Sequence, residues 1–287
     1  MGNTSKTLED QINAVFRHTR QGSIKTRERY RESGGRLARF LGERFQSKNM
    51  KNLQDKHVEA YVRFLQENNR SVSHIKTELS AIRWIADQVQ IKSPLSNAKS
   101  FNLRMEIGQR SFVGHDRTWN GRELQIIYQA PDRIRDVLVL ARDLGLRIHE
   151  AHRIDVAQTR NALRTGVLSV KGKGGLIRNV PLRGESHSVL QSAIERTLPG
   201  EKLFVPPDMP THVAIRGVQD YIRSHRPEDS TASAHGLRHL YARDRYLEFR
   251  AQGLSERHAK YQVSELLGHH RAEVTHIYLA SLKGLSK

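Results

Sequence analysis

The sequence predicts a mainly α-helical protein with a small antiparallel β-sheet in its C-terminal domain, that is, a helical N-terminal bundle followed by an α+β domain. The helical class follows from apolar residues that recur at helical spacing through residues 5–90, where no convincing strand pattern occurs. The sheet follows from two short β-rich runs, residues 167–170 and 176–182, which the turn sequence KGKGG joins as in a hairpin.

Four amphipathic segments make up the N-terminal region, and four short helices of this kind are expected to pack as a small bundle. The second segment starts near Ser23 and the fourth at Ser71 or Ser73, because serine is a favoured N-cap residue. The apolar positions of the four segments are Leu8, Ile12, Val15 and Phe16; Tyr30, Leu37, Phe40 and Leu41; Val58, Tyr61, Val62 and Leu65; and Ile75, Leu79, Ile82, Trp84 and Ile85.

A connector follows the bundle, because Pro94, Gly108 and Gly114 interrupt any periodic pattern while basic residues continue. In the next region, Asn120 followed by Glu123 is typical of a helix N-terminus, and Pro131 separates two apolar helices. Helix is expected again at residues 186–197, a strand or loop at 202–207, and helix with breaks at 211–282. We therefore predict a helical domain at residues 1–92, a basic linker at 93–118 and a second domain at 119–287.

The charge indicates a polyanionic partner. The formal net charge is +18, and nucleic acid is the commonest polyanion that so basic a protein binds. An anionic membrane surface and a basic surface without any partner are the alternatives, but no basic amphipathic terminal helix or lipidation signal supports the membrane. About half of the basic residues between the apolar positions of the bundle, such as Arg27, Arg31, Arg36 and Arg83, are expected to touch DNA.

The absence of cysteine excludes disulfides and thiolate metal sites. The N-terminal residues lack an apolar signal core, and no window approaches the roughly 18 apolar residues of a membrane span. A soluble cytoplasmic protein without a cofactor is therefore expected.

Two of four unusual clusters lie around the predicted hairpin. In GLRIHEAHRI (145–154), Arg147 follows a Gly-Leu turn, and Glu150 is placed to hold its guanidinium; a structural ion pair is the alternative. In VKGKGGLIRNVPL (170–182), Lys173 occupies a Gly-rich turn from which it can reach a phosphate or donate a proton. An ordinary exposed hairpin is the alternative for this second cluster.

The third cluster is HGLRH (235–239). In a helix, His235 and Arg238 share one face, whereas His235 and His239 have the i and i+4 spacing of metal ligands. A zinc-protease motif needs Glu directly after the first His, where this chain has Gly236, and no third ligand is evident. A metal site is therefore not expected, and core histidines remain the alternative.

The fourth cluster is LLGHHRAEVTHIYLAS (266–281), in which His269 precedes Tyr278 by nine residues. Two arginines, a lysine, two histidines and a tyrosine together suit attack on a phosphodiester. Forked guanidiniums stabilise the charge of the pentavalent transition state. A phenol with a free pKa of about 10 becomes a nucleophile when a histidine acts as base, and a mobile lysine can protonate the leaving 5′ oxygen. This chemistry needs no metal ion.

In order and wording, the four clusters resemble the tyrosine recombinase (phage-type integrase) family. The resemblance covers the second domain well, whereas the first domain resembles the family only in its general character. The family has an Arg in a Gly-Leu-Arg-x-x-Glu box, a Lys in a β-turn before Val-Pro-Leu, a His-x-Leu-Arg-His box, and Leu-Gly-His with a Tyr nine residues later. The corresponding residues are Gly145, Leu146, Arg147 and Glu150; Lys173 and 180–182; 235–239; and Leu267, Gly268, His269 and Tyr278.

The resemblance implies a site-specific recombinase that cleaves and rejoins double-stranded DNA without metal or ATP, as a homotetramer on two duplexes. It implies that residues 1–92 are a core-binding DNA-binding domain and 119–287 the catalytic domain. By the same resemblance, Arg147 and Arg238 clamp the scissile phosphate, with Glu150 in support. Lys173 is the general acid, and His235 aids proton transfer. His269 contacts the phosphate or orients the site, and Tyr278 forms the 3′-phosphotyrosyl link.

Alternatives remain open at this stage: a type IB topoisomerase-like enzyme, a recombinase-fold DNA-binding regulator without catalysis, and a nucleic-acid packaging protein. Only nine residues follow Tyr278 and no arm-binding domain precedes residue 5, so a simpler recombinase is expected, with open assembly contacts. The target sequence, the host or mobile element, and the choice among integration, excision, inversion and resolution do not follow from the sequence.

Overall fold

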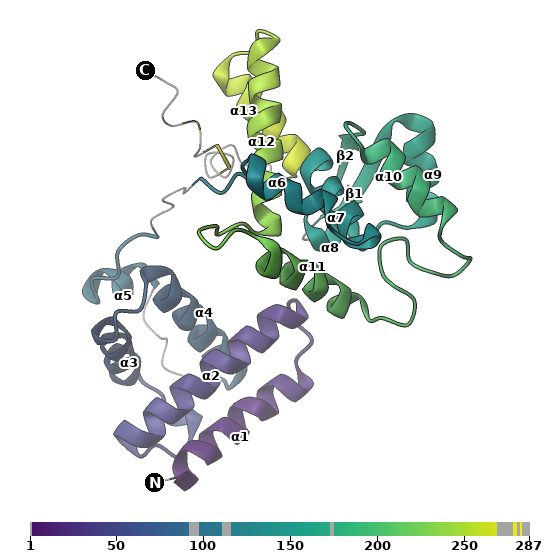
Figure 1. The fold of residues 1–287 in the computed structure, drawn as a ribbon. Helices are drawn as coiled ribbons and strands as arrows, with labels where there is room; N and C mark the ends of the chain where they lie inside the picture. Colours follow the sequence, from purple (N-terminus) through teal and green to yellow (C-terminus); the bar gives the residue numbers. More distant parts are fainter. Residues whose placement is uncertain are drawn as a thin grey trace. The chain divides into compact units, whose positions relative to one another are not determined.

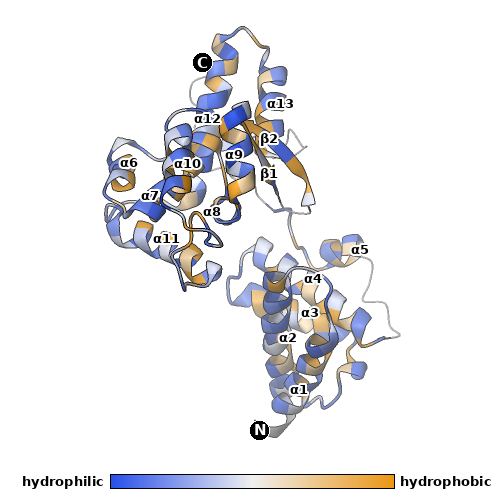
Figure 2. Ribbon diagram, turned by 90° about the vertical axis from the view of Figure 1, so that its right-hand side faces the viewer, coloured by the Kyte–Doolittle hydropathy of each residue, from blue (hydrophilic) through white to orange (hydrophobic). Residues whose placement is uncertain are grey.

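The computed structural model describes residues 2–91, 98–110, 116–172, 175–268, 278–279 and 282. The chain divides into two compact units, Met1–Ser111 and Phe112–Lys287 (Figure 1). In both units, polar and apolar residues alternate along the helices, as amphipathic helices around a core require (Figure 2). Within the described residues, no helix has the length and apolar character needed to cross a membrane.

Helices are the only regular secondary structure among the described residues of the first unit. Ser23 caps the second helix by accepting from Thr26 N, and Ser71 caps the fourth by accepting from His74 N, so of the two serines considered it is Ser71 that starts this helix. The elements are α1 (Gly2–His18), α2 (Ile24–Phe45), a 3-10 turn (Met50–Asn52), α3 (Asp55–Glu67), α4 (Val72–Gln88) and α5 (Ala98–Arg104).

One carboxylate lies inside this bundle. Glu78 of α4 is 1% exposed and accepts hydrogen bonds from Ser33, Arg36 and Tyr61. Burial alone would raise its pKa, but these bonds outweigh burial and lower the pKa. The network joins α2, α3 and α4.

The first half of the expected linker belongs to the first unit instead. Helix α5 lies inside residues 93–118, and Phe101, Met105 and Ile107 are buried in the core of the bundle. The Gly and Pro residues of this stretch suggested a connector, but the three apolar side chains at its centre bury enough surface to order it. The boundary between the units accordingly falls near residue 111.

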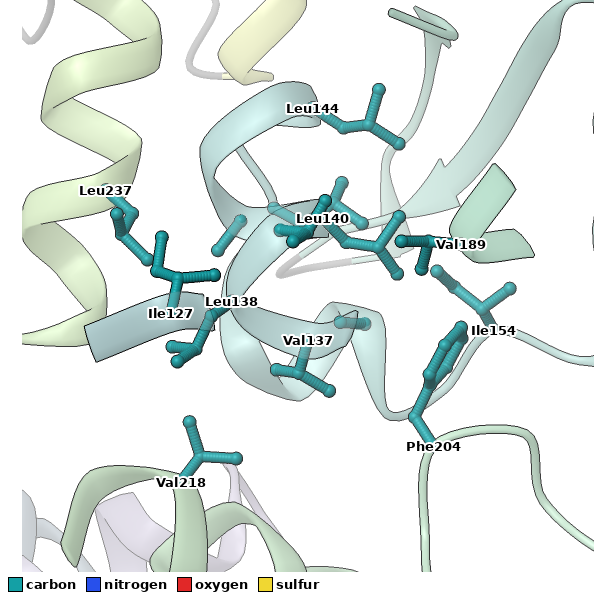
Figure 3. Close-up of a cluster of buried hydrophobic side chains, with 14 of the residues drawn as sticks. Ile127, Val137, Leu138, Leu140, Leu144, Ile154, Val189, Phe204, Val218 and Leu237 are labelled. Carbon is teal, nitrogen blue, oxygen red and sulfur yellow. The ribbon is translucent and has the colours of Figure 1, made fainter. Parts of the chain in front are cut away.

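The second unit is built around α7 (Asp132–Leu144), whose central residues are almost inaccessible to solvent. Figure 3 shows Val137, Leu138, Leu140 and Leu144 of this helix among the surrounding core side chains. Neighbouring elements are α6 (Gly121–Tyr128), α8 (Ile148–Ala151), α10 (Ser186–Glu195), α11 (Thr211–His225) and α12 (Ala234–Ala251). The predicted capping box of Asn120 and Glu123 starts α6.

The predicted hairpin is present as β1 (Val167–Lys171) paired antiparallel with β2 (Ile177–Pro181). Helix α9 (Val156–Thr165) precedes it, and β2 contacts α13 (Glu256–Leu267), which follows α12 (Figure 1). Residues 202–207, for which strand and loop were both open, form a loop with Leu203, Phe204 and Val205 buried.

Candidate active site

In sequence, Arg147 lies between the C-terminal end of α7 and the start of α8. Gly145 ends that helix with φ of +60°, and a Cβ there would overlap the ring of Tyr241, so both the turn and the packing favour glycine. Arg147 is then the N-cap of α8: its backbone N–H donates to Oε2 of Glu150 at 2.9 Å, and its Nη1 donates to Oε1 at 2.8 Å. The predicted contact between Arg147 and Glu150 is present.

Glu150 is shared by two arginines, and the family motifs include only one of them. Arg178 of β2 is 7% exposed and holds the same carboxylate with both terminal nitrogens. Burial acts to raise the pKa of Glu150, but the hydrogen bonds and charge of Arg178 outweigh it and lower the pKa to about 2. The missed signal was the strand alternation: Arg178 lies two residues before buried Val180, on the same face.

Helix α12 supplies three of the site residues. Its first turn can approach the chain at Arg117 and Trp119 because residue 236 is glycine: a Cβ there would overlap the Arg117 carbonyl oxygen and lie 2.7 Å from Cδ1 of Trp119. Trp119 Nε1 also donates to the carbonyl of Ser233, at the N-cap of the helix, at 2.9 Å. The start of α12 is thereby fixed in place.

Arg238 is fully buried and donates to the carbonyl oxygens of Gly145 and Leu267, at the ends of α7 and α13. Two helix C-termini, each with a partial negative charge, thus face one guanidinium. Burial, and then the nearby charge of Arg147, lower the pKa of Arg238 to about 10. The side chain is still charged at neutral pH.

Tyr278 lies against the same helix. Its hydroxyl is 3.3 Å from Nε2 of His235, and its ring centroid is 5.8 Å from the guanidinium carbon of Arg238. The ring of His239 packs on it with centroids 4.4 Å apart, so His239 is a packing partner of the tyrosine. With 5% of its surface exposed, Tyr278 is held in one place by these three neighbours.

His235 lies at the surface beside Tyr278, and its ring is neutral at physiological pH. Partial desolvation, followed by the positive charges of Arg238, Arg147 and Arg117, lowers the pKa of His235 to about 4. A neutral imidazole whose Nε2 carries no proton accepts a hydrogen bond from the phenol and is able to take its proton.

A cleft of about 470 Å³ opens next to these side chains, between α8, α11 and the start of α12. Arg147 and His235 both line it, so the two groups face the same space. Its other polar lining residues are His149, Gln219, Arg223, Ser233 and Arg226. The cleft is rich in positive charge, as a phosphate-binding surface requires.

Of the six predicted catalytic residues, Arg147, His235, Arg238 and Tyr278 lie together. Lys173 and His269 lie outside the described residues; in sequence, they follow Gly172, the residue after β1, and Gly268, the C-cap of α13. Within the described part of the chain, no group of three or more His, Cys, Asp or Glu side chains is arranged to hold a metal ion.

Residues 120–284 match the phage integrase family, and residues 5–91 match its N-terminal domain, described as phage integrase, N-terminal. The chain therefore belongs to the phage integrase family, the tyrosine recombinases.

Among curated proteins, the chain is similar to tyrosine recombinase XerC of Vibrio parahaemolyticus serotype O3:K6, with 27% identity over 216 residues. That match covers 72% of this chain and 66% of the relative. Among solved structures, the fold is similar to XerH recombinase bound to a palindromic difH substrate (TM-score 0.65, 19% identity, 96% and 82% of the two chains). It is also similar to a lambda integrase tetramer bound to a Holliday junction (TM-score 0.59, 16% identity, 92% and 78%).

Proposed function

We propose that this protein is a site-specific DNA recombinase that cleaves and rejoins strands through a phosphotyrosyl intermediate on Tyr278. The observation that carries the proposal is the phenol hydroxyl 3.3 Å from a neutral imidazole, with the charged Arg238 against the same ring. A base beside a phenol, within a field of fixed positive charge, is what activates a weak oxygen nucleophile toward a phosphodiester.

In the proposed step, the oxygen of Tyr278 attacks the scissile phosphorus, and His235 takes the phenolic proton. The bond from phosphorus to the 5′ oxygen breaks, and Lys173 gives the leaving oxygen a proton, so that a 3′-phosphotyrosyl link and a free 5′ hydroxyl result. Arg147 and Arg238 stabilise the non-bridging oxygens, and His269 adds a phosphate contact. Attack by a 5′ hydroxyl reverses the step, and the conserved bond energy makes ATP unnecessary.

The partner in this proposal is double-stranded DNA. The charge of +18 supports a polyanion, and XerH and lambda integrase were solved with DNA bound. We assign DNA binding to the helical unit and catalysis to residues 119–287, with the linker reduced to the residues after α5. A homotetramer on two duplexes is supported by the lambda integrase tetramer on its junction. We expect the protein to act in the cytoplasm.

Covalent trapping tests the proposal. The protein is incubated with a library of nicked suicide duplexes, whose short 5′ product diffuses away and prevents rejoining, and the mixture is run on a denaturing gel without added metal. A protein–DNA adduct that maps to Tyr278 by mass spectrometry supports the proposal. Intact DNA binding with no adduct from any duplex would favour a recombinase fold that only binds DNA.

A further inference from the structure

Arg178 lies at an inward-facing position of β2, where the alternation of the strand places side chains in the core. It pairs in register with Val170, its neighbours Ile177 and Asn179 face outward, and its side chain is 7% exposed. A guanidinium in such a position carries a large desolvation cost unless it is fully partnered. Its partners are therefore informative about its role.

Those partners belong to two other parts of the active site. Nη2 and Nη1 donate to Oε2 and Oε1 of Glu150 at 2.8 and 3.1 Å, and Nε donates to the carbonyl oxygen of Leu266 at 3.0 Å. Leu266 and Leu267, whose carbonyl receives Arg238, end the helix from which His269 follows. One side chain thus links β2, α8 and the end of α13.

The link formed by Arg178 also affects the electrostatics of the site, because Arg178 and Arg147 share the negative charge of Glu150. Each oxygen of Glu150 accepts once from Arg147 and once from Arg178. If Arg178 were absent, more of the carboxylate charge would fall on Arg147, which lines the cleft, and on nearby Arg238. With Arg178 present, Glu150 is already neutralised, and it orients Arg147 without cancelling the positive charge that a phosphate needs.

We propose that Arg178 is a positioning residue for strand cleavage: it neutralises Glu150, so that the charge of Arg147 stays available to the scissile phosphate, and it fixes the end of α13 next to His269. This inference rests on the proposed cleavage function for its consequence on rate. Its electrostatic part stands on the DNA-free protein and is measurable without cleavage.

The test uses Arg178→Met, the double variant Arg178→Met with Glu150→Gln, and Arg196→Met as matched control. Arg196, the C-cap residue of α10, also pairs with a buried carboxylate, Asp136 of α7, and is not one of the candidate site residues. Two quantities are measured: the single-turnover rate of adduct formation, and the rate at which phenylglyoxal modifies Arg147, followed by peptide mass spectrometry without DNA.

Arg178→Met should slow adduct formation about 10- to 100-fold and slow the modification of Arg147, because Glu150 then pairs with Arg147 alone. The double variant should recover both rates at least halfway, because the excess charge is gone, and Arg196→Met should match wild type in both. A double variant no faster than Arg178→Met, or a control as slow, would overturn the inference.

If wild type forms no adduct, the proposed function fails, and the rates at which phenylglyoxal modifies Arg147 alone decide the role of Arg178. Equal modification rates in wild type and Arg178→Met would then overturn the inference.

Discussion

The hydroxyl of Tyr278 lies 3.3 Å from Nε2 of His235, although 43 residues separate the two in sequence. Removing that hydroxyl tests the proposed nucleophile. Tyr278→Phe keeps the ring that packs on His239, so DNA affinity and melting temperature should stay near wild type while all covalent adduct disappears. Gel assays for adduct and anisotropy for DNA binding check this. Adduct formation by Tyr278→Phe would exclude Tyr278 as the nucleophile.

The low pKa of His235 predicts an unusual pH dependence. Because its ring must be neutral to accept the phenolic proton and its pKa is about 4, the second-order rate of adduct formation should not fall between about pH 7 and pH 5 on account of this group. The pH dependence of this second-order rate constant reflects the pKa values of the free enzyme, to which the pKa of His235 applies. A loss of activity centred near pH 6.5, absent in His235→Gln, would show that the ring titrates normally.

The same shift has a consequence for stability. His235 and His239 both have pKa values lowered to about 4, so the unfolded chain takes up protons near pH 6.5 that the folded chain does not. Stability should therefore be full above about pH 6.5 and decline as the pH falls from there towards 4. Urea unfolding at several pH values measures this slope, which should be smaller in His239→Phe.

The two arginines should differ in their structural importance. Arg147→Ala and Arg238→Ala should each slow adduct formation about 10²- to 10³-fold, the usual effect of losing one transition-state donor. Only Arg238→Ala should also lower the free energy of unfolding, by about 1–3 kcal/mol, because the buried carbonyls of Gly145 and Leu267 lose their donor. Near-wild-type rates with Arg147→Ala would remove that residue from the site.

Lys173→Ala tests the general acid that the family resemblance supplies. A duplex with sulfur in place of the bridging 5′ oxygen has a leaving group that needs no proton, so this substrate should restore most of the lost rate. Lys171→Ala is the matched control, an exposed lysine at the end of β1, and should cleave both duplexes like wild type. Equal defects of Lys173→Ala on oxygen and sulfur substrates would contradict the assignment.

Gly236 should resist substitution for reasons of space alone. Gly236→Ala places a methyl group against the Arg117 carbonyl and the Trp119 ring, and should destabilise the fold and displace His235. Gly217, in the middle of α11, has open space where an alanine methyl group would lie, with no neighbouring atom within 4 Å, so Gly217→Ala should raise stability by about 0.5–1 kcal/mol. Thermal unfolding of the pair checks both signs.

Local patterns in the sequence were sufficient for most of the helices, their serine and asparagine caps and the hairpin, because each depends on residues a few positions apart. They did not predict α9, between residue 154 and the hairpin. Family motifs were sufficient to name Arg147, His235, Arg238 and Tyr278 as one set. The linker was another exception: its glycines and proline suggested a connector, although the core of the bundle buries Phe101, Met105 and Ile107.

By itself, the sequence determined most of the elements, and it was sufficient to propose which side chains carry the chemistry, since both depend on short-range spacing. Only the tertiary structure decided how those side chains are paired. Three features join segments far apart in the chain: the partial desolvation and positive charges that keep His235 neutral, the two helix ends that receive Arg238, and the sharing of Glu150 between Arg147 and Arg178. Contacts of that kind depend on packing in three dimensions, which no local pattern encodes.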